Sequence, residues 1–182
     1  MAPTAGISPT RTRPVTGADS IDELTAILHR AFARFTESGI HMKAATQSVA
    51  ETRKRIAKGE CLIAEWNRQL IGTVVWRVPG RPNSPCGYYR RPSVATFEQL
   101  AVEPSKQGHD IGRALLDAVE SRALRAGATH VACDTAESAL DLISWYRRQG
   151  FQLVGQVRWR RTDHRNVVLS KPIGVAASES RL

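Results

Sequence analysis

The residues best suited to chemistry in this chain form one short stretch, Gln107-Gly108-His109-Asp110-Ile111-Gly112-Arg113. It follows an apolar, strand-like run and opens an amphipathic segment with helical spacing. The first backbone N–H groups of a helix have no partner within the helix, and the helix dipole places partial positive charge beside them. Glycines let such a backbone approach an anion closely. The stretch therefore predicts a binding site for a cofactor that carries phosphate.

Two common phosphate-binding loops do not match this stretch. A Walker loop requires lysine and then serine or threonine after its last glycine, whereas Gly112 is followed by Arg113 and Ala114. A dinucleotide-binding fingerprint requires a run of three glycines early in a βαβ unit. This stretch offers Gly108 and Gly112 alone and lies late in the chain, so neither class of nucleotide-binding protein fits.

Composition narrows the class of protein further. The chain has 182 residues and a net charge of +9, which attracts nucleic acid, an acidic membrane face or a phosphorylated cofactor without choosing among them. Cys61, Cys86 and Cys133 have the spacing of neither a disulfide framework nor a zinc site. The sequence shows no apolar run long enough to span a membrane and no secretion signal. We therefore expect a cytoplasmic protein without a metal site or a membrane partner.

Apolar periodicity predicts a single α/β domain over residues 13–173, between flexible tails at 1–12 and 174–182. Helices are predicted at 21–35, 43–58, 111–126 and 139–149, and strands at 61–66, 70–76, 95–102, 130–134, 151–159 and 167–171. Alternation of strands and helices in the second half favours some parallel pairing. The last two strands, joined by a short loop, are expected to form an antiparallel hairpin, and residues 79–92 a long loop.

The order of these elements resembles that of the GNAT-type N-acetyltransferase superfamily over residues 13–171. Leu100-Ala101-Val102-Glu103-Pro104 precedes the glycine stretch, as an apolar-Ala-Val-x-Pro run precedes the Gln/Arg-x-x-Gly-x-Gly/Ala loop of that family. Tyr146-Arg147-Arg148-Gln149-Gly150-Phe151 is similar to the family's Tyr-x-x-x-Gly-Phe signature at the end of a helix. The sequence departs from the family at Asp110, where the loop has its inner glycine, and at Ala139, where the family often has asparagine.

The resemblance implies a GNAT-like fold, an α/β (α+β) arrangement with a mixed, splayed central sheet of six to seven strands and about four flanking helices. It also implies acetyl-CoA as co-substrate, with the backbone of Leu100, Ala101 and Val102 pairing with the pantetheine arm. The pyrophosphate would be bound by the stretch that follows, made of Gln107, Gly108, His109, Asp110, Ile111, Gly112 and Arg113. The carboxylate of Asp110 would repel that group unless it points to solvent and caps the following helix.

Two side chains are candidates for catalysis. Tyr146 matches the position of the family's general acid, which protonates or contacts the departing thiol and so touches the cofactor. Glu98 lies two residues before Leu100, on the same face of an ideal strand, and is the candidate base that takes a proton from the amine. Glu103 and Asp134 are weaker candidates, and Asp134 is expected at the end of a strand, where it caps the segment after it.

The function predicted from the resemblance is transfer of an acetyl group from acetyl-CoA to a primary amine of a small molecule or peptide. No activated nucleophile is evident, which favours direct attack in a ternary complex over a covalent enzyme intermediate. The basic segment 159–166 would suit an acceptor that bears a carboxylate. Nucleic acid is not an expected partner, whereas such folds often pair as homodimers. The alternative, supported by the net charge of +9 and by Asp110, is a non-catalytic acyl-CoA-binding or nucleic-acid-associated regulatory module.

Overall fold

The computed structural model describes residues 10–160 and 162–174, and within them seven strands form one mixed sheet in the order β1-β2-β3-β4-β5-β7-β6. The strands are β1 (Arg11–Pro14), β2 (Glu60–Trp66), β3 (Gln69–Arg77), β4 (Val94–Val102), β5 (His130–Ala136), β6 (Gln152–Val157) and β7 (Asn166–Pro172). The α-helices are α1 (Ile21–Glu37), α2 (Val49–Ile56), α3 (Ile111–Arg125) and α4 (Leu140–Arg148). Short 3-10 turns occur at η1 (Lys43–Ala45), η2 (Tyr88–Arg90) and η3 (Pro104–Lys106).

The sheet consists of two antiparallel halves joined by one short parallel contact. Strands β1 to β4 pair antiparallel in chain order, and β7 pairs antiparallel with both β5 and β6. Between the halves, β4 and β5 pair over three residues each, from Val94 with His130 to Thr96 with Ala132, and then separate. The expected mixed and splayed sheet, its central parallel pairing and its C-terminal hairpin are confirmed.

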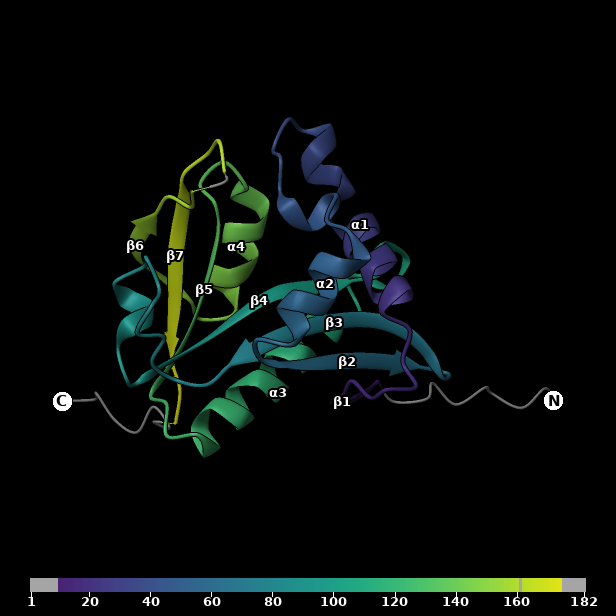
Figure 1. Ribbon diagram of the computed structural model, residues 1–182, viewed down its shortest axis with the longest axis horizontal. Helices are drawn as coiled ribbons and strands as arrows, with labels where there is room; N and C mark the ends of the chain where they lie inside the picture. The colour runs from purple at the N-terminus through teal and green to yellow at the C-terminus, as the bar shows by residue number, and fades with distance from the viewer. Residues whose placement is uncertain (1–9, 161, 175–182) are drawn as a thin grey trace.

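Apolar clusters fix the helices on the two faces of the sheet. On one face, Leu115 of α3 and Ile143 of α4 join a cluster that draws side chains from both halves of the sheet. On the other face, Leu24 of α1 packs against β2 and β3. Segment 79–92 covers the β5–β7 region of that same face through Tyr89. Figure 1 shows α1 and α2 on one side of the strands and α3 on the other.

Serine caps determine where the first two helices begin. Ser20 accepts a hydrogen bond from the N–H of Glu23 at 3.2 Å, and α1 starts there as predicted. The prediction of one helix over 43–58 is wrong, because Ser48 accepts the N–H of Glu51 at 3.2 Å and starts a separate helix. A capping residue has an extended backbone, so the helix cannot continue through it, and the residues before it form η1 instead.

Strand β1 is a whole element that the sequence did not predict. Arg11 and Thr12, assigned to the N-terminal tail, belong to β1 and pair with β2. This edge strand has four residues and little alternation of apolar and polar side chains, so its sequence carries no periodic pattern typical of a strand. The rest of the expected tails, residues 1–9 and 175–182, lies outside the described residues. None of the described helices is long and apolar enough to cross a bilayer.

Strand β4 carries a bulge in the part that has separated from β5. Thr73 and Val75 of β3 stand opposite Ala101 and Glu98, so β4 has one residue more than β3 over this interval. Gln99 within it has a φ of +57°, a left-handed conformation that is uncommon in a residue with a side chain. A bulge of this kind shifts the alternation of side chains between the two faces, which decides where the site residues of β4 point.

Candidate active site

A first cavity of about 520 Å³ lies at the N-terminus of α3, with α1 and α4 contributing its other walls. It brings together most of the predicted cofactor-binding residues, namely Leu100, Ala101, Val102, Gln107, Gly108, Asp110, Ile111, Gly112 and Arg113. His109 is not among the residues that line it. Its ring packs edge-on against Trp66, with the ring centroids 5.8 Å apart. Tyr146, expected to touch the cofactor, lines a neighbouring cavity instead.

The start of α3 leaves the N–H groups of residues 111–113 without acceptors inside the helix. Asp110 precedes them with a φ of +58°, which aspartate tolerates better than most residues, and its carbonyl accepts the N–H of Ala114 at 2.9 Å. The side chain of Asp110 is exposed, as expected, but it makes no capping hydrogen bond, so that part of the prediction is wrong. The left-handed backbone explains why the family can place glycine there.

Gly112 allows α3 to pack closely against α4. A Cβ atom at this position would lie 3.1 Å from Cζ2 of Trp145, tighter than ordinary van der Waals contact. Gly108 has a different reason, because its φ is +81° and there is open space where a Cβ would stand. The two glycines of the stretch therefore keep one side of the cavity free of side-chain atoms.

The first cavity carries an excess of positive charge. Its walls include four cationic side chains, Arg34, Lys106, Arg113 and Arg148, and two carboxylates, Asp110 and Asp141. Arg113 is exposed, and it makes a long hydrogen bond to Gln149 at 3.3 Å and a long ion pair with Asp117 at 4.0 Å. Cations beside unpaired N–H groups form a suitable site for phosphate.

The edge of β4 that faces β5 is unpaired over residues 97–102 of the described chain, because the parallel pairing ends at Thr96. Backbone N–H and C=O groups require partners, and an extended ligand with amide groups can pair with a free strand edge. Leu100, Ala101 and Val102 of this edge also line the first cavity. The prediction that their backbone meets an amide-bearing arm is therefore consistent with the sheet geometry.

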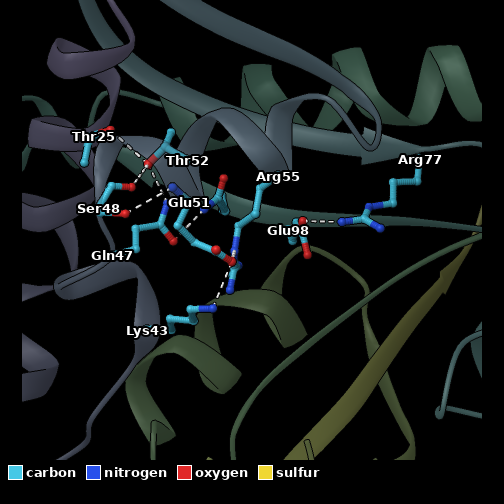
Figure 2. A network of polar contacts seen from close by, with 10 residues as sticks. Thr25, Lys43, Gln47, Ser48, Glu51, Thr52, Arg55, Arg77 and Glu98 are labelled. Atoms are coloured by element: carbon cyan, nitrogen blue, oxygen red, sulfur yellow. Dashed lines mark hydrogen bonds and ion pairs between the residues drawn. The ribbon is translucent and has the colours of Figure 1, made fainter. Parts of the chain in front are cut away.

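A second cavity of about 460 Å³ occupies the gap between the separated strands β4 and β5. The segment around η1 and α2 closes another side, and Figure 2 shows polar side chains of that segment in one view with Glu98 and Arg77. Phe32, Leu100 and Leu142 line both cavities, so the two meet at these residues. A ligand in the first cavity and a ligand in the second would come into contact there.

Tyr146 lines the second cavity and is buried, with 5% of its surface exposed. Its ring packs edge-on against Trp145 and Phe151, and the Cys133 thiol is close enough to influence its hydroxyl. Burial, followed by the proximity of Cys133, raises the pKa of Tyr146 well above its ordinary value. The phenol is therefore protonated at neutral pH and is available as a hydrogen-bond donor.

Glu98 lines the same cavity and accepts a hydrogen bond from Nη2 of Arg77 at 2.6 Å. The expectation that Glu98 and Leu100 share a face of the strand is wrong. Glu98 stands opposite Val75, whose side chain packs toward α1, whereas Leu100 packs with the cluster under α3 and α4. The bulge at Gln99 causes the difference. The two predicted catalytic residues nevertheless line one cavity.

Asp134 lies inside β5 and lines the second cavity, so the expectation that it ends a strand and caps the next segment is wrong. Its carboxylate accepts hydrogen bonds from the Tyr89 hydroxyl at 2.8 Å, the Trp159 indole at 2.7 Å and the Asn166 amide at 2.6 Å. These donors tie the loop before β4 to the β6–β7 hairpin. Glu103, the other weaker candidate, pairs with Arg30 at 2.7 Å and lines neither cavity.

Sequence reasoning missed Arg77 and Arg81, which also line the second cavity. Arg77 ends β3, and Arg81 is held by a hydrogen bond from its backbone N–H to the carbonyl of Tyr89 at 2.9 Å. Their spacing carries no motif, and their place in the site follows from the β3–β4 register and from the path of a long loop. Among the described residues, no group of three or more histidine, cysteine or acidic side chains is placed to bind a metal.

Comparison with known proteins now decides the family. Residues 23–151, more than half of the chain, match the Acetyltransferase (GNAT) family. The chain belongs to this family. It is a GNAT acetyltransferase, and its acetyl group comes from acetyl-CoA. A comparison with curated protein sequences found no match.

Solved structures share the fold of this GNAT acetyltransferase at low sequence identity. PH1933 from Pyrococcus horikoshii OT3 has a TM-score of 0.70 at 16% identity, over 92% of this chain and 100% of the other. The ribosomal-protein-S18-alanine N-acetyltransferase from Escherichia coli has a TM-score of 0.67 at 16% identity, over 96% and 100%. A GNAT family acetyltransferase from Elizabethkingia anophelis with acetyl-CoA bound has a TM-score of 0.64 at 17% identity, over 90% and 98%.

Proposed function

We propose that this GNAT acetyltransferase binds acetyl-CoA in the first cavity and acetylates a primary amine held in the second, by direct attack in a ternary complex. The observation that carries the proposal is the meeting of the two cavities at Phe32, Leu100 and Leu142. The first cavity has the unpaired helix start, and the second has the two predicted catalytic side chains, Glu98 and Tyr146. Reactants that are bound side by side can react without passing through an enzyme-bound intermediate.

The one cysteine that lines the second cavity within the described residues supports direct attack. Cys133 is buried, and burial raises the pKa of its thiol well above the ordinary value. The reactive form of cysteine is the thiolate, so a thiol held protonated is a poor nucleophile. Cys133 is therefore unsuited to carry the acetyl group between donor and acceptor.

The residues of the first cavity fit acetyl-CoA. The free edge of β4 at Leu100, Ala101 and Val102 offers hydrogen-bonding groups to the pantetheine amides. The N–H groups of residues 111–113, with the guanidinium of Arg113, offer donors to the pyrophosphate. The side chain of Gln107 donates to the carbonyl of Val102 at 3.1 Å, which positions the loop between these two parts of the site. We propose no contact to the cofactor for His109.

The proposed roles of the two catalytic residues follow from their protonation and contacts. Acetyl-CoA supplies a thioester, whose C–S bond breaks as the amine nitrogen bonds to the acetyl carbon. Glu98, positioned by Arg77, accepts the proton that the amine must lose, directly or through a water molecule. Tyr146 donates its hydroxyl proton to the sulfur that departs, and the proton taken up by Glu98 then returns to the phenolate through solvent. Amide and CoA thiol then account for all the atoms of the reactants.

Calorimetric titration of acetyl-CoA and of free CoA into the purified protein, at two salt concentrations, tests the first part of the proposal. We expect one equivalent to bind at both concentrations, more weakly at the higher one because phosphate contacts are screened. Failure to bind at either concentration would contradict the proposal. It would favour the non-catalytic regulatory module, whose test is a salt-sensitive affinity for nucleic acid without turnover.

Substitution of the two catalytic residues tests the second part. With an amine panel and a thiol-release assay, Tyr146→Phe and Glu98→Gln are each expected to lower kcat at least tenfold, the range typical of lost acid–base catalysis being roughly 100- to 10,000-fold. The affinity for acetyl-CoA should not change. Matched controls are Tyr88→Phe, which removes a hydroxyl bonded to Ser170, and Glu120→Gln, which removes an ion pair with Lys171. Full turnover by both catalytic variants would refute their assignment.

A further inference from the structure

Two arginine side chains, Arg77 at the end of β3 and Arg81 just after it, line the second cavity, and one of them is ion-paired. Nη2 of Arg77 bonds to Glu98 at 2.6 Å, while Arg81 forms no ion pair with any described residue. The guanidinium of Arg81 lies over the ring of Tyr89, with 5.5 Å from its central carbon to the ring centroid. It is half-buried, and burial, reinforced by the nearby charge of Arg77, lowers the pKa of Arg81. A positive charge in such a place is costly unless an anion joins it.

The remaining charges of the second cavity do not supply that anion. Its walls hold six lysine and arginine side chains and three carboxylates. Glu51 is already shared by Lys43 at 2.8 Å and Arg55 at 3.6 Å. Asp134 is occupied by the three neutral donors described above. The cavity therefore has an excess of positive charge. Arg81 is a half-buried cation in it that has no ion pair with a described residue.

Unpartnered polar atoms mark the same cavity. Four buried side-chain atoms of the described residues have no hydrogen-bond partner, and their residues, Arg77, Thr96, Thr135 and Asn166, all line it. Thr96 stands directly opposite Arg77 in the β3–β4 register, so Oγ1 of one and Nε of the other lie on one wall. Buried polar atoms are nearly always paired, and their concentration at one site indicates a polar ligand.

We propose that the second cavity binds an amine acceptor that also carries a carboxylate, and that Arg81, assisted by Arg77, binds this carboxylate through its guanidinium. The proposal rests on the second cavity being the acceptor site. A guanidinium matches a carboxylate with two parallel hydrogen bonds, which fixes the orientation of a small acceptor as well as its charge. The acceptor class is therefore that of free amino acids and related amino carboxylates.

The same charges disfavour another class of acceptor. A polyamine or an amino sugar would bring additional positive charge into a cavity that already has an excess of it, and like charges repel. The cavity volume of about 460 Å³ accommodates a compact amino carboxylate. We therefore expect the second cavity to select its acceptor first by charge and then by the shape of the acceptor's side chain.

The test compares acceptors that differ only in charge. The intact chain is assayed for thiol release from acetyl-CoA with a panel of amino acids and, for each one, its uncharged carboxamide. We expect the best amino acid to exceed its carboxamide at least tenfold in kcat/KM. Arg81→Gln should abolish this preference by raising the KM for the amino acid, and Arg81→Lys should restore part of it.

A control separates the proposal from a general effect of charge. Arg53→Gln on the exposed side of α2 removes the same charge without touching either cavity, and it should leave the preference unchanged. Acetylation of carboxamides or polyamines in place of amino acids would overturn the inference and leave the proposed function intact. Binding of CoA without turnover of any amino acid would also overturn the inference. Loss of CoA binding itself would instead refute the proposed function.

Discussion

At the scale of single residues, Asp110 is the position where this chain differs most instructively from its family. Its exposed carboxylate precedes three unpaired N–H groups that favour a negative ligand. The left-handed backbone of Asp110 is tolerated because aspartate adopts it at small cost. Glycine adopts the same left-handed conformation readily, so we expect the charge of Asp110 to be the main difference from a site with glycine.

Asp110→Asn isolates this charge, because asparagine also tolerates the left-handed conformation. We expect the affinity for CoA to rise several-fold, corresponding to about 1 kcal/mol for a screened pair of charges near the surface. Calorimetry at two salt concentrations measures the change, which should shrink at the higher one. Asp22→Asn, exposed on α1, is the control for net charge. Equal affinity of Asp110→Asn and the parent chain would show that the carboxylate is directed away from the phosphates.

The residues of the cofactor stretch could be predicted because they are contiguous and their chemistry lies largely in the backbone. Arg81 could not, because no local pattern connects it with Glu98 or Asp134. It reaches the cavity through a loop whose path is set by the burial of Tyr89. Side chains that meet only through tertiary structure leave no spacing in the sequence.

At the scale of elements, the bulge of β4 determines which cavity each side chain of this strand faces. A network of buried polar side chains holds it: Gln99 donates to Gln47 at 2.9 Å, Gln47 donates to Thr52 at 2.7 Å, and Thr25 bonds to Thr52 at 2.9 Å. Figure 2 shows the part of this network on and before α2. The network joins α1, α2 and β4, so a strained residue of the sheet is fixed by two helices.

Gln47→Ala should release the bulge, because the side-chain amide of Gln99 would lose its buried acceptor. We expect the free energy of unfolding to fall by roughly 1–3 kcal/mol, the cost of leaving a buried polar group unpaired. We also expect kcat to fall, since Glu98 precedes the loosened residue. Urea denaturation measures the first effect and the thiol-release assay the second. Gln69→Ala, at the exposed start of β3, should change neither. Unaltered stability of Gln47→Ala would mean that the bulge is held by the strand alone.

The strand itself was predicted within one residue at its start, whereas the bulge was not. Apolar residues from Val94 to Val102 suffice to indicate a buried strand. An extra residue in a buried strand leaves the composition unchanged, so ideal alternation placed Glu98 and Leu100 on one face. Composition misled the prediction at η1 and α2 as well. Helix-forming residues before and after Ser48 suggested one helix, although Ser48 caps the start of a separate one.

At the scale of the whole molecule, an ion network attaches the N-terminal strand to the sheet. Arg13 of β1 pairs with Asp19 at 2.8 Å and with Glu65 of β2. The hydrogen bonds from Arg13 lower the pKa of Asp19 and of Glu65 below their ordinary values of 3.8 and 4.5. Because these pKa values are lowered by folding, the network stabilises the protein above them and loses its effect as the pH falls through them.

Arg13→Gln tests this dependence on pH. We expect the free energy of unfolding at pH 7 to fall by roughly 1 kcal/mol, because the pairs are only partly buried. The difference from the parent chain should already be smaller at pH 3, where the carboxylates of the unfolded chain are largely protonated, and it should vanish only at a still lower pH, below the lowered pKa values of the folded chain. Urea denaturation at the two pH values measures both quantities, with Arg53→Gln as the control for charge. A difference that stayed constant with pH would contradict the role of the two carboxylates.

The sheet has two halves, β1 to β4 and β5 to β7, which meet at the three-residue contact between β4 and β5. Each half, or leaf, is held internally by antiparallel hydrogen bonds, and few backbone hydrogen bonds cross between the two leaves. A small rotation about this contact widens the gap most at its far end, where the two cavities meet. The apolar cluster under α3 and α4 spans both leaves and limits the rotation. We therefore expect the contact to act as a hinge that opens the gap for reactants and products while each half of the sheet keeps its shape.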